Sequence, residues 1–353
     1  MKHRSYSKFW HRIHTSAKKR GFPLRVMFEL TYRCNFRCKH CYVPQSYRKN
    51  SELSTREVFA ILAQLKDAGC FYLGFTGGEP FVREDALDIF WYAKRCGFEV
   101  IIYTNGSLID EARAEELAKL RPNKVDITIP ALNERAFESI VGGSGYRDKV
   151  FKAIELLHKK GVNLGFKTCV LRENENEIGQ IQRFADSLGA LHRLDTMLSS
   201  RLDGDRKPYE YRGDIRQNRE PKNESANCQI VKLLNCSNEV KSLFKCGVGV
   251  SQAAITPLGE LKMCLMIDYP RYKIETRDEG GGTKDERQKN TNLREQWQRL
   301  KGLVVDIKPD ENYQCGRCEL EPYCKWCPAK SWLSYRNFTS CDLESRRWAQ
   351  LNC

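Results

Sequence analysis

The feature that most constrains the fold is a regular alternation of short β-rich runs with helical patterns between Leu24 and Met197. Six strands are predicted, at residues 26–30, 71–75, 98–104, 124–129, 162–171 and 191–198. Strands that alternate with helices form a parallel sheet with the helices outside it. The pattern therefore predicts an α/β fold, either an open doubly wound sheet or a partial (β/α)6 barrel.

The predicted helix after the first strand has clear signals at both of its ends. Ser54 and Glu57 form a capping box at its start, and Gly69 fits the left-handed position just beyond its end. Similar glycine stops occur at Gly97, Gly161 and Gly189. One face of the helix is apolar and is expected to pack on the sheet through Val58, Ile61, Leu62 and Leu65.

Composition narrows the class of protein. The chain has 353 residues, a formal net charge of +14 and 41% hydrophobic residues, which excludes a chain that is disordered throughout. No run approaches eighteen apolar residues, and the basic N-terminus lacks the apolar stretch of a signal peptide, so a cytoplasmic protein with no transmembrane segment is expected. In a reducing compartment, sixteen cysteines indicate metal or redox chemistry rather than a disulfide framework.

Four regions are predicted along the chain. A basic arm spans 1–24, an α/β core spans 25–198, and a polar linker or substrate-covering segment spans 199–235. The last region, 236–353, shows little helical periodicity, and residues 228–353 hold ten of the sixteen cysteines. A loop-rich segment of this kind would struggle to build an apolar core, so bound metal is its predicted organiser.

Three cysteines cluster directly after the first predicted strand. Cys34, Cys38 and Cys41 form a C-x3-C-x2-C pattern, which we call the first cysteine loop. Three thiolates at this spacing fit three corners of a [4Fe-4S] cluster and leave the fourth iron open. A zinc site would need a fourth ligand, and His40, next to Cys41, would have difficulty reaching the same ion. Folds of this type bind ligands at the C-terminal ends of their strands, which favours the iron–sulfur interpretation.

A second motif, Thr76-Gly77-Gly78-Glu79-Pro80, follows the second predicted strand. Together with the first cysteine loop, it resembles the radical S-adenosylmethionine (radical SAM) enzymes. The resemblance implies a partial (β/α)6 barrel in which the open iron chelates the amino and carboxylate groups of SAM. An electron from the cluster then splits the sulfonium and gives a 5′-deoxyadenosyl radical, which abstracts a substrate hydrogen.

The resemblance also implies a set of contacts with SAM. Glu79 is expected near the SAM ammonium, where Gly77 and Gly78 let the backbone approach the ligand closely. The other implied SAM-binding positions are Tyr42, Pro80, Asn105 and Thr128. Tyr42 is expected at the adenine, although an aromatic residue there could equally be core packing.

Two positions depart from the family's pattern. The frequent Ser-hydrophobic-Asp after the fourth strand stands here as Thr128-Ile129-Pro130. The arginine that often follows about a dozen residues later in the family aligns best with Val141. The group that neutralises the SAM carboxylate is therefore not identified from the sequence.

The C-terminal cysteines resemble the seven-cysteine SPASM extension, which holds up to two auxiliary [4Fe-4S] clusters. The resemblance implies an inner cysteine group of Cys246, Cys264 and Cys327, and an outer cysteine group of Cys315, Cys318, Cys324 and Cys341. Cys236 or Cys228 could supply a further inner ligand. The alternative interpretation of the paired C-x2-C motifs is one or two zinc sites. The remaining cysteines within strand or helix patterns are interpreted as buried small hydrophobes: Cys70, Cys96 and Cys169.

Radical SAM proteins with two auxiliary clusters mostly act on peptides. The resemblance therefore predicts a maturase that crosslinks or otherwise oxidises a ribosomally made peptide. Its implied partners are the peptide and an external reductant of the flavodoxin or ferredoxin type. Because only 33 residues precede Cys34, leader recognition is expected to fall to a separate leader-peptide-binding protein, the basic N-terminus or the C-terminal region. Anaerobic sulfatase-type maturation and modification of a cofactor-precursor peptide are alternatives within the same class.

RNA modification is the alternative from another class, because Lys and Arg can neutralise phosphates. The positive charge is, however, spread over many predicted helix faces, and the chain has no RNA-binding signature, so nucleic acid is not the expected partner. Residues 1–24 contain Lys and Arg but no acidic residue, and could contact a partner, a peptide or a membrane surface.

Overall fold

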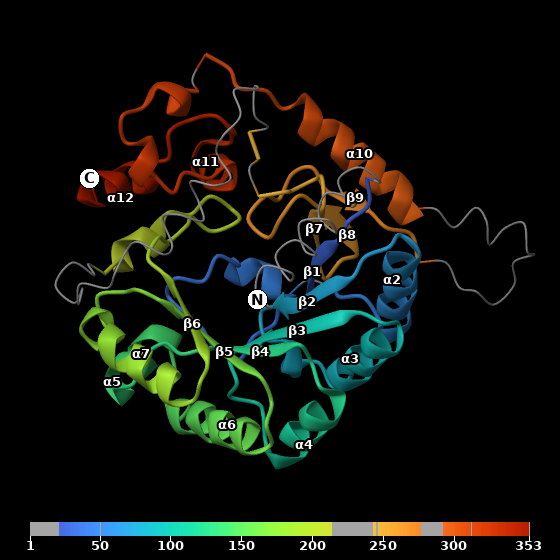
Figure 1. Cartoon of the computed structure of the whole chain (residues 1–353), viewed down its shortest axis with the longest axis vertical. Helices are drawn as coiled ribbons and strands as arrows, with labels where there is room; N and C mark the ends of the chain where they lie inside the picture. The colour runs from blue at the N-terminus through green and yellow to red at the C-terminus, as the bar shows by residue number, and fades with distance from the viewer. Residues whose placement is uncertain are drawn as a thin grey trace, which may run out of the picture.

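The computed structural model describes residues 21–49, 51–213, 243–244, 246–276, 292–311 and 313–352. Six parallel strands occupy the positions that the sequence predicts: β1 (Arg25–Thr31), β2 (Tyr72–Gly77), β3 (Glu99–Thr104), β4 (Lys124–Thr128), β5 (Leu164–Cys169) and β6 (Leu191–Asp195). Each strand pairs in parallel with the next one along the chain (Figure 1).

The order of the strands decides between the two predicted architectures. Within the described residues, the sheet has the order β6-β5-β4-β3-β2-β1-β7-β8-β9. A doubly wound sheet reverses its strand order at a switch point, whereas β1 to β6 progress in one direction as they do in a barrel. The predicted partial (β/α)6 barrel is therefore confirmed. The doubly wound alternative is wrong, because alternation of strands and helices does not by itself fix strand order.

The sheet continues beyond β1 with three strands from the C-terminal part of the chain. β7 (Gln252–Ile255) pairs in parallel with β1, and β8 (Glu260–Lys262) and β9 (Tyr272–Lys273) follow in antiparallel pairing. Part of the predicted C-terminal region is thus attached to the sheet of the core along β1.

Helices cover one face of the sheet, and their ends follow the sequence signals. Helix α2 (Thr55–Asp67) begins with the Ser54–Glu57 capping box, and Gly69 after it has a φ of +86°. The stops at Gly97, Gly161 and Gly189 also have positive φ. The other helices between the parallel strands are α3 (Ala86–Arg95), α4 (Glu111–Leu120), α5 (Glu134–Val141), α6 (Arg147–Lys159) and α7 (Ile178–Ser187).

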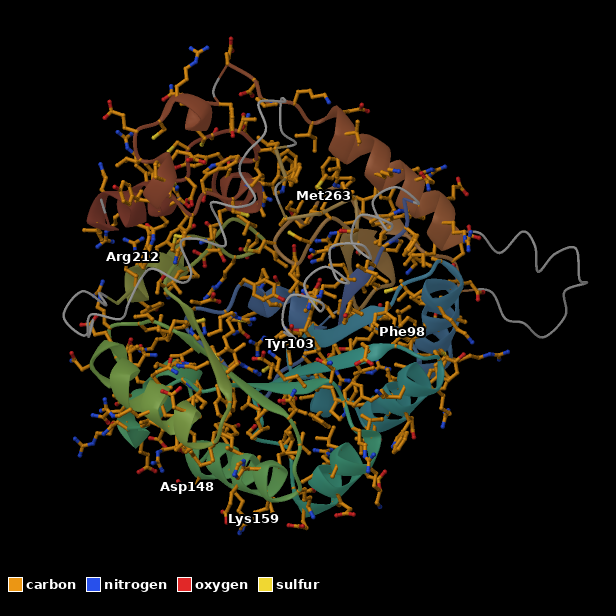
Figure 2. All side chains as sticks on the ribbon, in the orientation of Figure 1. Phe98, Tyr103, Asp148, Lys159, Arg212 and Met263 are labelled. Carbon is orange, nitrogen blue, oxygen red and sulfur yellow. The ribbon has the colours of Figure 1, made fainter. Side chains whose placement is uncertain are left out.

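Alternate residues of the strands separate an apolar face from a polar one. Phe28 of β1 stacks on Phe75 of β2, which contacts Phe90 of α3, and all three are fully buried. On the other face, β1 places the buried polar residues Glu29 and Thr31. Figure 2 shows Asp148 and Lys159 at the rim of the helix layer and Tyr103 near the centre.

The C-terminal part contains more regular structure than the sequence predicts. Helix α10 (Asn292–Asp306) lies beside β9 and α2, while α11 (Pro328–Tyr335) and α12 (Leu343–Asn352) lie apart from it, beyond β6 (Figure 1). The expectation of little helical periodicity is wrong for α10, which buries one apolar stripe: Leu293, Trp297, Leu300 and Val304. Among the described residues, no helix is both long and apolar enough to cross a membrane.

Candidate active site and auxiliary cysteine groups

The first cysteine loop leaves the C-terminal end of β1 and packs against helix α5. Phe36 is buried and contacts the rings of Phe137 and Tyr146. The N–H of Lys39 donates to the carbonyl of Ile140 at 3.1 Å. The loop is therefore held by a neighbouring helix through both side-chain packing and the backbone.

The two departures from the family's pattern have structural roles in this chain. Val141 is fully buried, and its carbonyl accepts a hydrogen bond from the N–H of Arg37 at 2.7 Å. The carbonyl of Pro130 accepts a hydrogen bond from Nδ2 of Asn174 at 2.7 Å. Both positions thus serve neighbouring loops through the backbone, and neither offers a charge to a ligand.

The thiols of the first cysteine loop lie close enough to affect one another's ionisation. Burial raises the pKa of Cys34 to about 11 and holds that of Cys38 well above its usual range, and a thiolate at Cys41 adds to both shifts. The N–H of Phe36 donates to Cys34 Sγ at 3.3 Å, and Arg48 Nη1 donates to the carbonyl of Cys34 at 3.2 Å. A metal cluster would stabilise these buried thiols as thiolates, so this donor set fits a thiolate-ligated cluster.

The glycine motif locks the end of β2 to the backbone after β1. A Cβ atom on Gly77 would lie 2.2 Å from the carbonyl oxygen of Thr31, and one on Gly78 would lie 2.1 Å from that of Arg33. The N–H of Gly78 donates to the Thr31 carbonyl at 2.7 Å. Sequence reasoning attributed these glycines to a ligand, but close backbone contact already requires them.

Glu79 joins the C-terminal ends of β2 and β3. Its side chain is fully buried and accepts hydrogen bonds from the hydroxyl of Thr104 at 2.8 Å and from the N–H groups of Asn105 and Phe81 at 2.6 and 3.1 Å. Burial raises the pKa of Glu79 to about 7 in spite of these donors. Pro80, also buried, begins the short 3-10 turn η2 (Pro80–Val82) directly after it. Contact between Glu79 and a SAM ammonium remains a prediction.

Asn105 belongs to a side-chain network that includes two residues the sequence did not reveal. Its Nδ2 donates to Oδ1 of Asn35 at 2.9 Å and lies 3.9 Å from Cys34 Sγ, and its Oδ1 accepts a hydrogen bond from the hydroxyl of Ser107 at 2.7 Å. Asn35 Nδ2 donates to the same hydroxyl at 2.8 Å. The position of Asn35 directly after Cys34 was the only available signal. The network fixes the cysteine loop to the end of β3.

Tyr42, next to Cys41, is tied to the polar face of the sheet. Its hydroxyl donates to Oε1 of Glu29 at 2.8 Å. Burial, followed by the Glu29 carboxylate, holds the pKa of Tyr42 well above its ordinary value. The residue as a whole is half-buried, and its role at an adenine remains a prediction.

Thr128 lies at the end of β4 beside Lys167 of β5, with which it pairs in register. Lys167 forms an ion pair with Asp195 at the end of β6, with 2.6 Å between Nζ and Oδ2. Sequence reasoning missed this pair, because a strand pattern alone does not reveal which charges meet across neighbouring strands. The pair brings a cation to the same end of the sheet as Thr128.

Three cysteines were interpreted as buried small hydrophobes. Cys70 is buried before β2, and Cys96 is half-buried at the end of α3 and packs on the core, as that interpretation expects. Cys169 ends β5 and lies near the first cysteine loop. Burial raises the pKa of its thiol to about 11, and a Cys41 thiolate contributes to the shift.

The described cysteines of the C-terminal part fall into two sets of neighbours. Burial raises the pKa of Cys264 to about 12, and a thiolate at Cys327 adds to the rise. The pKa of Cys327 is also raised, first by burial and then with a contribution from Cys246. These three residues form the inner cysteine group that the resemblance implies. Cys228 and Cys236 lie outside the described residues.

The outer cysteine group shows the same behaviour. Burial raises the pKa of Cys324, and thiolates at Cys341 and Cys318 add to the shift. Cys315 opens the short turn η6 (Cys315–Arg317), and the N–H of Cys318 donates to its carbonyl at 3.4 Å. In the described part of the chain, no three His, Cys, Asp or Glu side chains converge as they would around a single metal ion. Ligation by either group remains a prediction.

Leu202 links the first cysteine loop to the C-terminal helices. Its N–H donates to the carbonyl of Tyr42 at 2.9 Å, and its carbonyl accepts a hydrogen bond from Nη2 of Arg336 at 3.0 Å. Arg336 follows α11, the helix that begins directly after Cys327. Leu202 therefore joins the first cysteine loop to the helix that follows Cys327.

Curated relatives share part of this chain. Residues 28–185 match the model of the Radical SAM superfamily. PqqA peptide cyclase from Gluconobacter oxydans is 30% identical over 169 residues, which are 48% of this chain and 47% of that protein. Fe-coproporphyrin III synthase from Methanosarcina barkeri is 29% identical over 157 residues, which are 44% of this chain and 39% of that protein. The matches thus span less than half the length of either relative.

A solved structure shares the fold over most of the chain. SuiB from Streptococcus suis, bound to S-adenosylmethionine, superposes with a TM-score of 0.63 and 17% identity, and covers 93% of this chain and 77% of SuiB. The structure of SuiB in complex with its precursor peptide SuiA superposes with a TM-score of 0.64 and 18% identity, and covers 94% of this chain and 78% of SuiB. The superfamily match contains both the first cysteine loop and the glycine motif. Residues 28–185 of this chain are therefore similar to the Radical SAM superfamily.

Proposed function

We propose that this chain is a radical SAM peptide maturase with auxiliary clusters, which oxidatively modifies or crosslinks a ribosomally made peptide. The observation that carries the proposal is the direct link, through Leu202, between the first cysteine loop and the helix that follows Cys327. The first cysteine loop would hold the [4Fe-4S] cluster of the radical SAM family. When bound, this cluster and SAM supply the 5′-deoxyadenosyl radical that removes a substrate hydrogen.

The residues around the first cysteine loop would bind and orient SAM. The backbone at Gly78 and the buried carboxylate of Glu79 shape the edge that the SAM ammonium would approach. Asn105 and Thr128 lie at the ends of neighbouring strands, and Lys167 brings positive charge beside Thr128. Lys167 is thus a candidate for the cation that Val141 does not supply.

The seven described C-terminal cysteines would hold one or two auxiliary clusters. Their separation into an inner and an outer cysteine group supports this assignment, and Cys246, Cys318 and Cys341 are exposed enough for clusters to be assembled from solution.

The peptide substrate is proposed from two relatives. PqqA peptide cyclase acts on a peptide by its name, and SuiB has been solved with a precursor peptide. A cavity of about 780 Å³ lies between the 3-10 turn η4 (Lys207–Tyr211) and helices α11 and α12, close to the outer cysteine group. Its lining mixes both charges with apolar surface and includes Arg206, Tyr209, Arg212, Ser334, Leu343 and Glu344. Figure 2 labels Arg212 at this edge of the molecule.

SAM cleavage tests the assignment of the first cysteine loop. Anaerobically reconstituted protein, reduced with dithionite in place of a flavodoxin or ferredoxin, should release 5′-deoxyadenosine from SAM. Cys34→Ala should abolish this release, whereas Cys70→Ala, at a buried cysteine just before the N-terminal end of β2, should retain it. Continued cleavage by Cys34→Ala would contradict the assignment.

Iron analysis tests the auxiliary clusters. The parent protein should bind about eight to twelve irons per chain under this assignment. Cys327→Ala should lose about four of them while SAM cleavage continues, and Cys96→Ala is the matched control that should lose none. Zinc in the parent, or an iron content of only about four per chain, would remove the auxiliary clusters from the proposal.

Synthesis of an iron porphyrin is the second candidate function, because Fe-coproporphyrin III synthase matches nearly as much of the chain as the peptide cyclase does. Reduced protein with SAM can be given a short peptide encoded beside its gene, or an iron porphyrin, and the products analysed by mass spectrometry. Loss of a pair of hydrogens from the peptide would support maturation. Conversion of the porphyrin alone would reverse the order of the two candidates.

A further inference from the structure

We propose that a buried ion pair between Glu29 and Lys262 is a positioning device that fixes the separation of the first cysteine loop from the inner cysteine group. The inference rests on the proposed function only in treating both sets of cysteines as cluster ligands. Glu29 lies on β1 and Lys262 on β8, with 2.8 Å between Oε2 and Nζ. Their side chains are 0% and 1% exposed, so water does not contribute to holding the pair together.

The pair reaches both cysteine-bearing segments directly. The Glu29 carboxylate accepts a hydrogen bond from the hydroxyl of Tyr42, the residue after Cys41. Lys262 stands two residues before Cys264, and its Nζ donates to the carbonyl of Leu265 at 3.1 Å. A single buried contact therefore connects the end of one predicted ligand set to the middle of the other.

The geometry of the sheet makes this contact possible. β1 and β8 are not neighbours, because β7 lies between them. Met27 of β1 pairs with Ala254 of β7, and Ala254 pairs with Lys262 of β8, so these side chains share one face with Glu29. The small, fully buried side chain of Ala254 leaves room for the lysine to cross β7.

The energetics point to a role in positioning rather than in stability. Removing two charges from water is costly, and well-packed apolar residues in place of a buried ion pair are often equally stable or more so. Apolar contacts are not directional, so an apolar pair would not hold the Tyr42 hydroxyl and the Leu265 carbonyl at fixed distances. Here both carboxylate oxygens are engaged, since the hydroxyl of Tyr32 also donates to Glu29 Oε2 at 3.2 Å.

A second connection keeps the two segments attached when the pair is removed. Arg271, before β9, forms an ion pair with Glu260 at 3.3 Å and lies 5.9 Å from the ring centroid of Tyr47, in the turn after the first cysteine loop. Loss of the Glu29–Lys262 pair is therefore expected to loosen the spacing of the two cysteine sets without separating them.

The test uses the double variant Glu29→Gln/Lys262→Met in the anaerobically reconstituted full chain. Glutamine preserves an acceptor for Tyr42, and methionine fills the volume of the lysine stem without its charge. The spin–spin interaction between the reduced clusters should change from one sharp distance to a longer, broader distribution, while iron content stays at the parent value. The single variant Lys262→Arg, which keeps a positive charge opposite Glu29, should give a distance distribution close to that of the parent.

The matched control is Lys124→Met/Asp126→Asn. This double variant removes another ion pair of the sheet, at 2.6 Å with side chains 19% and 3% exposed, which touches neither cysteine set. It should leave the cluster distance unchanged. A Glu29→Gln/Lys262→Met protein with full iron and the parent's distance would overturn the proposal. If that variant does not fold, Tyr42→Phe replaces it, and an unchanged distance there has the same meaning.

Amide hydrogen exchange separates failure of this proposal from failure of the proposed function. The N–H of Ile267 donates to the Cys264 carbonyl at 3.3 Å and reports on that turn. Its exchange should accelerate in the Glu29→Gln/Lys262→Met protein and not in the control. If the parent holds no C-terminal iron, the auxiliary clusters fail, and exchange alone then decides: acceleration upholds the positioning role, and unchanged exchange overturns it.

Discussion

The two cysteine-bearing parts of this chain are supported in opposite ways. The first cysteine loop follows a strand with neighbours on both sides, and residues from β2, β3 and α5 hold it by hydrogen bonds between distant parts of the sequence. The outer cysteine group lies on the short turns η6 and η7 (Glu321–Tyr323) and just before α12, where the backbone bonds are local. The backbone N–H of Cys324, for example, donates to the carbonyl of Glu321, three residues earlier.

The two sites therefore obtain their geometry from different sources. Around the first cysteine loop, buried aromatic residues and strand pairing fix the backbone before any metal binds. Around the outer cysteine group, the described turns are largely exposed, and a metal bound by the thiols would add links between turns that few other contacts join. The first site is therefore built by the sheet, whereas the second depends on what its thiols bind.

Iron removal should give the largest effect and tests this contrast directly. In zinc-finger peptides, metal binding contributes on the order of 10 kcal/mol to folding. If iron organises residues 313–352 in the same way, their amides should lose protection from hydrogen exchange once the iron is chelated. Residues 72–169 should keep their protection, because their strands pair with one another. Hydrogen exchange of the reconstituted and chelated proteins, followed by mass spectrometry, measures both regions at once. Equal loss of protection in the two regions would contradict the idea that only the C-terminal part depends on metal.

The sequence predicted the first region well because its signals are local. The strands from β1 to β6 alternate with helices whose caps, such as Ser54 and Gly69, stand at the chain positions where the structure has them. The strands β7 to β9 were not predicted. They are two to four residues long, and QAAI of β7 has little strand propensity, so pairing with β1 rather than local preference creates them.

The candidate site was predictable where cysteines and glycines mark it, and not where charges meet across the sheet. Spacing alone located the first cysteine loop, and Gly78 was found with it. No local pattern shows that Glu29 is buried or that Lys262, far along the chain, is its partner. The same holds for Lys167 and Asp195, which meet only because β5 and β6 are neighbours.

Glu79 should make the stability of the first region depend on pH. Burial raises its pKa to about 7 in the folded protein, above the ordinary value of 4.5. The proton that Glu79 binds in the folded state contributes stability that is fully present below about pH 4.5 and lost as the pH rises through about 7. The side chain of Glu79→Gln cannot ionise. As the pH rises across this range, the free energy of unfolding of this variant should therefore increase relative to that of the parent by on the order of 3 kcal/mol.

Urea unfolding of SAM-free protein at a series of pH values measures this difference. Glu134→Gln, at an exposed carboxylate that opens α5, is the matched control for the loss of one negative charge. A stability difference between Glu79→Gln and the parent that stays constant from about pH 5 to about pH 8 would contradict the assignment of this effect to Glu79.

Gly78→Ala should damage the first site without touching a ligand. Its Cβ atom would lie 2.1 Å from the carbonyl oxygen of Arg33 and 2.8 Å from that of Tyr32, and backbone atoms cannot move aside as side chains do. Overpacking of this kind costs typically about 1–3 kcal/mol, and the first cysteine loop would have to shift. Iron bound by the first site should fall while iron in the C-terminal part is retained. Full retention at both sites would show that the loop tolerates movement.

The smallest expected effect is that of Gly302→Ala, which tests whether α10 unfolds with the sheet or with the metal-dependent C-terminal part. Gly302 lies inside α10, and a Cβ atom there would have no neighbour within 4 Å, so Gly302→Ala should stabilise by about 0.5–1 kcal/mol through helix propensity alone. Helix α10 is anchored on the core, since Trp297 Nε1 donates to the Gly21 carbonyl at 2.8 Å and the N–H of Leu293 to the Gln64 side chain at 3.1 Å. The gain should therefore appear in the unfolding of iron-free protein together with the sheet. If it appeared only in the holoprotein, α10 would belong to the metal-dependent region, and the boundary between the two would lie nearer to β9.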